Sequence, residues 1–280
     1  MEPNIVLRKL RKERNVSQIE LSKGVSTRNT LGSYEQKGTS INYYVLRQYL
    51  EKLNVSIEEF DYLISPNKEN YKKFMSTTLE KLYYNQNYKN CLQLLSDIKN
   101  KYDATQDFYF LHLVAQYRLA LHKEKVIHLD NEEIDFFIAE IKRYLEKIET
   151  WGQFEIAVFI NTMHIFDTEY IIQMIANVCK KKSIYSTLYK KYHILEKMYL
   201  NTLYLLFERR EVQLVPGIIN SFWLIIDKDD LKSKVIISFL EGIVENDEPK
   251  RRRALQILRT FDMDSHADYL SSLCQKSNLN

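Results

Sequence analysis

The chain has 280 residues, which is enough to bury a sizeable core and to form two domains. It carries 40 basic and 37 acidic side chains, and this small surplus does not imply nucleic-acid binding by the surface as a whole. Only four prolines and six glycines interrupt the sequence, and apolar residues recur at helical spacing, so we expect an all-α protein.

The cysteines and the apolar segments indicate the compartment. Cys91, Cys179 and Cys274 are far apart and lie in apolar helical settings, which argues against a disulfide framework and favours a reducing environment. No secretory signal begins the chain, and the most apolar stretch, 214–226, is too short to span a membrane and contains Pro216-Gly217. We expect a soluble cytoplasmic protein with no membrane partner.

The positive charge is concentrated near the N-terminus. Residues 1–37 hold eight basic and four acidic side chains, whereas residues 38–64 hold two basic and four acidic ones. The first predicted helix, 4–14, turns Leu7 and Leu10 inward and carries basic residues around them. The basic surplus therefore lies on the first three predicted helices.

Two short helices joined by a turn follow this first helix. Ser17 and Glu20 have the spacing of a capping box at the start of the second helix. Thr27 is placed to cap the third helix, and Gly38 marks its end. Ser56 is placed to open a fifth helix with the same capping device. This arrangement predicts a helix-turn-helix domain in which the third helix reads DNA.

The third predicted helix and its surroundings supply the candidate DNA contacts. Side chains of its first turns would meet base edges in the major groove, and they are Arg28, Asn29, Thr30 and Ser33. Residues at helix N-termini, where backbone amides favour a phosphate, are Ser17, Gln18 and Thr27. Flanking phosphate contacts are expected from Lys12, Lys37 and Tyr43. For any single lysine, a merely solvated position is an equal alternative.

The motifs LRxxR, VSQIEL, YExxG and VSIEEF, in that order across residues 5–63, resemble the Xre or lambda-repressor-like helix-turn-helix family. The resemblance implies that Arg11 and Glu35 form a structural ion pair and do not read bases. Two residues separate Glu35 from Gly38 where the family usually has one, so the turn after the third helix is open to reshaping.

The rest of the chain is predicted to be a helical array. A proline-containing segment, 65–70, is expected to link a helix-turn-helix domain at 1–64 to a second domain at 71–280. Helices are expected at 69–85, 88–101, 105–122, 131–148, 152–166, 168–182, 187–209, 211–226, 230–246, 249–261 and 264–276. Their pairs repeat every 35 to 45 residues, which predicts a superhelical array of degenerate tetratricopeptide-like helix hairpins.

Three asparagines in apolar helices are candidate peptide ligands. An asparagine side chain offers both a donor and an acceptor, as an extended peptide backbone requires. Asn161, Asn201 and Asn220 each lie inside an apolar helix, where a buried amide is costly. The alternative for any one of them is an amide satisfied within the helix bundle. Three in successive helices favour a peptide-binding surface.

The order of segments across the whole chain resembles the Rgg/GadR/MutR branch of peptide-responsive regulators. The resemblance rests on an Xre-type head, a linker with proline, and the segments WGQFEIAVFINTMHIF, NTLYLLF and DDLKSKVIISFLEGI. It implies a homodimer that binds palindromic promoter DNA and whose repeat domain receives a short signalling peptide in quorum sensing. The apolar helices 230–246 and 249–276 are candidates for the dimer surface.

No pattern in the sequence indicates catalysis. The six histidines are scattered without metal-ligand spacing, and no phosphate-binding glycine loop or nucleophile elbow is present. We expect neither an enzyme nor a bound cofactor or metal. Two functions remain: a transcription regulator controlled by a peptide, and a constitutive regulator or scaffold whose repeats bind another protein.

Overall fold

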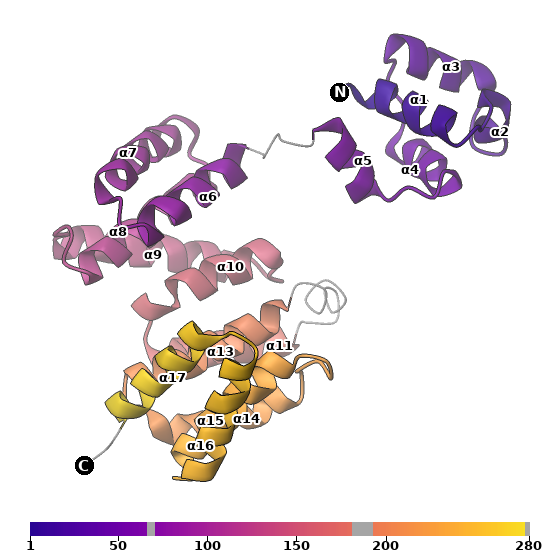
Figure 1. Cartoon of the computed structure of the whole chain (residues 1–280). Helices are drawn as coiled ribbons and strands as arrows, with labels where there is room; N and C mark the ends of the chain where they lie inside the picture. Colours follow the sequence, from indigo (N-terminus) through magenta and orange to yellow (C-terminus); the bar gives the residue numbers. More distant parts are fainter. Residues whose placement is uncertain (66–70, 181–192, 278–280) are drawn as a thin grey trace. The chain divides into compact units, whose positions relative to one another are not determined.

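In a computed structural model, residues 1–65, 71–180 and 193–277 are described, and within them the secondary structure is helical, with no strand (Figure 1). This confirms the predicted all-α class, a helix-turn-helix head followed by a helical array. The chain divides into two compact units, residues 1–94 and 95–280. Most of the predicted linker, 66–70, lies outside the described residues, so its boundaries stay a prediction. No described helix is long and apolar enough to cross a membrane.

The first unit begins with five helices. They are α1 (Pro3–Glu13), α2 (Gln18–Ser22), α3 (Arg28–Lys37), α4 (Tyr43–Lys52) and α5 (Ile57–Ile64). Leu7, Leu21, Leu31, Tyr49 and Phe60 are fully buried members of their core. Because each helix contributes at least one of these side chains, the five helices share one core, and α3 is fixed on α1 and α2.

The described helices of the array follow in chain order. They are α6 (Tyr71–Tyr84), α7 (Tyr88–Thr105), α8 (Phe108–Lys123), α9 (Asn131–Lys147), α10 (Gln153–Thr162), α11 (Thr168–Lys180), α13 (Ile194–Glu208), α14 (Val215–Trp223), α15 (Leu231–Val244), α16 (Glu248–Thr260) and α17 (Asp264–Ser277), with two 3₁₀ turns, η1 (Met163–Ile165) and η2 (Val212–Leu214). Each predicted helix has a counterpart here.

Two predicted helices include a 3₁₀ turn at one end. The helix expected at 152–166 ends as the 3₁₀ turn η1, and the one expected at 211–226 starts as η2. Pro216 lies in the first turn of α14, where a missing backbone N–H costs no helical hydrogen bond, so the proline starts a helix there. The first residues of the helix expected at 187–209, up to 192, lie outside the described residues.

The hairpin of α15 and α16 depends on a close approach at Gly242. A Cβ placed on Gly242 would lie 2.9 Å from Cγ of Arg251 and 3.1 Å from the backbone oxygen of Asp247. Arg251 also donates from Nη1 to the Gly242 carbonyl oxygen at 2.9 Å. The two helices therefore pack backbone against side chain at this position, and there is no room for a methyl group.

Replacing Gly242 by alanine is expected to lower the free energy of unfolding, because overpacking costs about 1–3 kcal/mol. The higher helix propensity of alanine offsets up to about 1 kcal/mol of this loss. Gly217→Ala is the matched control, because a Cβ on Gly217 in α14 meets nothing within 4 Å. That variant should be neutral or slightly stabilised. Urea unfolding of both variants measures the difference. Equal effects of the two substitutions would contradict the close approach.

Candidate nucleic-acid interface and ligand-binding surface

Side-chain caps begin the two helices of the helix-turn-helix, as the sequence predicts. The Glu20 backbone N–H donates to Ser17 Oγ at 3.1 Å, and the Ser17 N–H donates to the Glu20 carboxylate at 2.7 Å. Hydrogen bonds from the Ser17 side chain and from the Ser17 backbone N–H to the carboxylate lower the pKa of Glu20. Thr27 accepts from the Thr30 N–H at 3.1 Å at the start of α3. The predicted capping box and the Thr27 cap are confirmed.

The end of α3 is also fixed. Gly38 adopts φ 64°, in the left-handed region that glycine enters without strain, and its N–H donates to the Tyr34 oxygen at 2.9 Å. The two residues between Glu35 and Gly38 therefore form part of an ordinary glycine helix end.

A buried ion pair joins α1 to α3. Arg11 donates from Nε and Nη2 to the two carboxylate oxygens of Glu35 at 2.6 and 2.7 Å. Burial would raise the pKa of Glu35, but hydrogen bonds from Arg11 and Gln18 and the charge of Arg11 outweigh burial and lower it. The ion pair implied by the Xre resemblance is confirmed, and it fixes the orientation of α3 on α1.

The outer face of α3 carries the candidate base-reading side chains. Arg28, Asn29 and Thr30 are exposed, and Ser33 is half-buried. No hydrogen bond or ion pair joins Arg28 or Asn29 to another described residue, so their donors and acceptors are available for a ligand. The Thr30 hydroxyl instead pairs with that of Thr27 at 2.9 Å.

The structure adds a residue that the sequence prediction missed. Gln36 is exposed and follows Asn29 by seven residues and Ser33 by three, so the three side chains lie on one face of α3. Leu31 and Tyr34 lie on the opposite, buried face. Amphipathic spacing around Leu31 and Tyr34 was the signal in the sequence that places Gln36 outward.

The predicted phosphate contacts differ in their availability. Lys12 and Lys37 are exposed and lack a partner among the residues described, whereas the Gln18 amide donates to Glu35 at 2.9 Å. Gln18 therefore also helps to hold the ion pair. Ser17 is engaged in its own capping box, because its N–H donates to the Glu20 carboxylate and its hydroxyl also hydrogen-bonds to that carboxylate.

Tyr43 is the remaining predicted flanking contact, at the first position of α4. It is 55 % exposed, and the guanidinium of Arg47 lies 6.0 Å from the centre of its ring. Arg47 therefore adds a positive charge over the Tyr43 ring, at a position that the sequence prediction did not include.

The three asparagines of the second unit lie at its surface. Asn161, Asn201 and Asn220 are exposed, on α10, α13 and α14 respectively, and α13 packs against both other helices. The prediction that these amides are buried was wrong, because all three residues lie on exposed sides of their apolar helices. The alternative, an amide that is hydrogen-bonded within the helix bundle, is also excluded among the described residues. None of the three side-chain amides has a hydrogen-bond partner there.

Helix α13 provides the clearest of these exposed sides. Most of its side chains are buried, and its exposed residues are Lys197, Asn201 and Glu208. Their spacing of four and seven residues places them on one face. Asn220 on α14 is followed by Trp223 at the end of that helix and by Leu224 directly after it, and their exposed fractions are 41 % and 85 %. We call Asn161, Asn201, Asn220, Trp223 and Leu224 the asparagine surface.

Arg209 fixes the chain next to Asn161. Its Nη2 donates to the carbonyl oxygens of His164 and Phe166 at 3.1 and 2.6 Å, and its Nη1 donates to the Thr168 hydroxyl at 2.9 Å. Burial, with the charges of Lys123 and Arg209, lowers the pKa of His164 to about 4. The imidazole is therefore neutral at pH 7. Arg209 connects η1 and the start of α11 to the end of α13.

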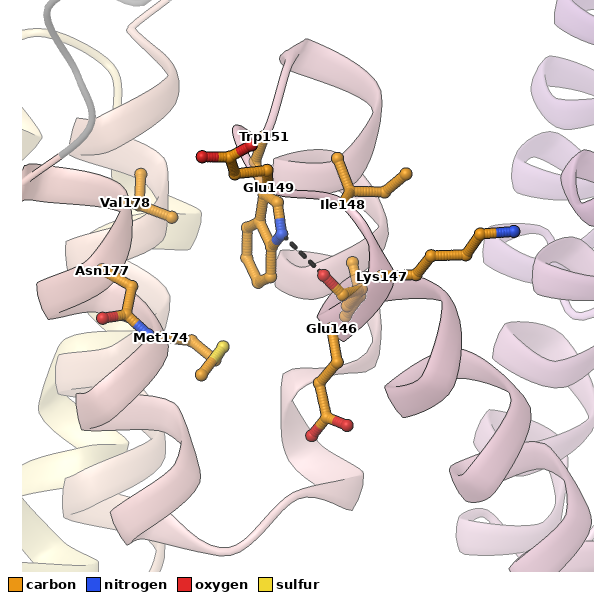
Figure 2. A pocket seen from close by; sticks show the side chains of 9 residues that line it. Glu146, Lys147, Ile148, Glu149, Trp151, Met174, Asn177 and Val178 are labelled. Atoms are coloured by element: carbon orange, nitrogen blue, oxygen red, sulfur yellow. Dashed lines mark hydrogen bonds between the residues drawn. The ribbon is translucent and has the colours of Figure 1, made fainter.

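A separate cavity of about 420 Å³ lies between the end of α9 and α11 (Figure 2). Figure 2 shows Met174 and Asn177 of α11 extending toward the indole of Trp151. Trp151 donates from Nε1 to the Leu145 oxygen at 2.9 Å, and Glu146 also lines the opening. The cavity contains none of the three predicted asparagines. Only Trp151 lay in a segment that the sequence analysis had singled out.

The chain matches two family models. A helix-turn-helix model matches residues 7–60, and the model described as HTH-type transcriptional regulator Rgg, C-terminal domain, matches residues 92–272. The second match alone covers more than half of the chain.

Solved structures share this fold over nearly their whole length. The SHP pheromone receptor Rgg2 of Streptococcus dysgalactiae is 17 % identical, with a TM-score of 0.77 over 98 % of this chain and 99 % of that one. A putative transcriptional regulator from Listeria monocytogenes is 16 % identical, with a TM-score of 0.79 and coverage of 100 % and 99 %. PrgX in its complex with cCF10 is 15 % identical, with a TM-score of 0.76 and 99 % coverage of both chains.

Proposed function

The chain belongs to the Rgg family of HTH-type transcriptional regulators, and we propose that it is a homodimer that binds palindromic promoter DNA through α3. The observation that carries the proposal is the pair Arg28 and Asn29, exposed and without partners among described residues on a helix held by caps and an ion pair. Arginine suits the O6 and N7 of guanine, and asparagine suits the N6 and N7 of adenine. The regulator acts in the cytoplasm, where its DNA lies.

A short peptide that binds the asparagine surface is proposed to control this DNA binding. Two observations support the proposal: similar folds belong to a pheromone receptor and to PrgX bound to cCF10, and the amides of this surface have no partners among described residues. An extended backbone needs donors and acceptors, which the amides of Asn161, Asn201 and Asn220 offer. Trp223 and Leu224 supply apolar area for a hydrophobic side chain.

Alanine at Asn161, Asn201 and Asn220 together is expected to weaken peptide binding by about tenfold or more, because each lost hydrogen-bonding amide costs about 0.5–1.5 kcal/mol. Isothermal titration calorimetry with synthetic hydrophobic peptides, encoded by short open reading frames beside the gene, measures the change. Asn100→Ala is the matched control, since Asn100 is an exposed asparagine on α7. Unchanged affinity in the triple variant would remove the asparagine surface from the proposal.

The second candidate function is a constitutive regulator or scaffold whose repeats bind a protein partner. The exposed Trp223 and Leu224 favour it equally, because a protein surface can cover them as well as a peptide. The two functions differ in one measurement: a peptide-controlled regulator changes its affinity for its own upstream DNA when the peptide is added, and a constitutive one does not.

A further inference from the structure

Three side chains with metal-ligating atoms meet where α13 and α15 begin. His193 directly precedes α13, Glu196 lies in its first turn, and Asp230 directly precedes α15. One ligand atom from each residue can be chosen so that all three lie within 4.8 Å of one another. The residues come from two segments that are far apart in the sequence, so the fold itself brings them together.

Glu196 is the unusual member of this group. Its side chain is only 6 % exposed, and its one ion-pair or hydrogen-bond partner among the described residues is His193 Nδ1 at 3.5 Å. Buried carboxylates normally have hydrogen bonds, because losing water without replacing it is costly. The one polar group beside this carboxylate is an imidazole nitrogen, 3.5 Å away, which donates a hydrogen bond when protonated and binds a metal ion when not.

Helix capping accounts for only one carboxylate oxygen of the cluster. Asp230 accepts from the Ser233 N–H at 3.0 Å through Oδ1, which leaves Oδ2 without a partner among the described residues. Glu196 makes no capping hydrogen bond at the start of α13. The positive ends of the two helix dipoles repel a cation, but each is equivalent to only about half an elementary charge. The two negative charges of Glu196 and Asp230 exceed this positive charge.

We propose that His193, Glu196 and Asp230 bind a divalent transition-metal ion. An imidazole nitrogen favours zinc and its neighbours in the first transition row over magnesium or calcium. Three protein ligands leave a coordination position for water or another ligand. The ion would join the start of α13, which carries Asn201, to the start of α15. The proposal does not depend on peptide binding.

Equilibrium dialysis of the metal-depleted full chain, without a histidine tag, against Zn²⁺ tests the site. One ion per chain is expected, with affinity lowered about tenfold or more in both His193→Ala and Glu196→Gln. Asp230→Asn keeps the capping oxygen and should also weaken binding. The His193 side chain is 53 % exposed, so replacing it by alanine should leave the fold intact. The His193→Ala result therefore decides the test if a substitution at buried Glu196 disturbs folding.

His128→Ala is the control, because the rings of His122 and His128 lie 5.8 Å apart and form the obvious competing site. That variant should keep full binding. Zinc should also raise the midpoint of thermal unfolding of the wild type and of His128→Ala, but not that of His193→Ala. The proposal would be overturned if the wild type bound less than one ion per chain. It would also be overturned if His193→Ala and Glu196→Gln bound zinc as tightly as the wild type, or if His128→Ala lost binding.

Discussion

Replacing Arg28 or Asn29 by alanine is expected to weaken binding to the regulator's own upstream DNA by about 5- to 150-fold per substitution. Each side chain suits two hydrogen bonds to one base, and a good pair of this kind discriminates by about 1–3 kcal/mol. Both residues are exposed without partners among described residues, so removing them should leave the fold of the head intact. Mobility-shift titrations against operator DNA and scrambled DNA of equal length measure affinity and specificity separately.

Two further variants separate base reading from charge. Lys9→Ala removes one positive charge from an exposed position in α1 that pairs with Glu13 at 3.7 Å, and it should leave specificity unchanged. Lys12→Ala should weaken binding to both DNAs equally and lower the dependence on salt, as a phosphate contact does. If Arg28→Ala behaved like Lys12→Ala, Arg28 would be a phosphate contact and the assignment of α3 as base reader would rest on Asn29 alone.

The head could be predicted closely because its determinants are local. The Ser17 and Glu20 capping box and the glycine end at Gly38 depend on spacings of a few residues, which the sequence displays directly. The hydrogen bond from Gln18 to Glu35 joins positions 17 residues apart. It depends on how α2 and α3 pack, so a pattern of residue types could not reveal it.

The second unit was predicted in its helices but not in its surfaces. Helix α13 is apolar on nearly all sides, so its sequence does not indicate which narrow side remains exposed, and Asn201 was assumed to be costly to bury. The meeting of His193 with Asp230 depends on the placement of α13 beside the start of α15. The cavity at Trp151 and Asn177 likewise requires two helices in their final positions.

Breaking the buried Arg11–Glu35 pair is expected to produce the largest loss of stability in the head. Arg11→Met would leave the Glu35 carboxylate fully buried with Gln18 as its remaining side-chain donor among described residues. Removing one partner of a buried pair costs about 3–5 kcal/mol, because the other charge is then uncompensated. Hydrogen exchange of amides in residues 5–63 of the full chain measures this loss. At the exposed Lys9–Glu13 pair, Lys9→Ala should cost at most about 1 kcal/mol.

The double variant Arg11→Met/Glu35→Leu distinguishes a buried pair from two independent contacts. It should lose less stability than Arg11→Met alone, because no unpaired charge remains, whereas independent contacts would give a loss equal to the sum of the single variants. The pH dependence follows the same reasoning. The pKa of Glu35 is lowered in the folded head, so its contribution is present above the ordinary glutamate pKa and is lost as the pH falls through the lowered value. The double variant should therefore be less sensitive to acid than the wild type, and equal sensitivity would mean that Glu35 does not determine the acid stability of the head.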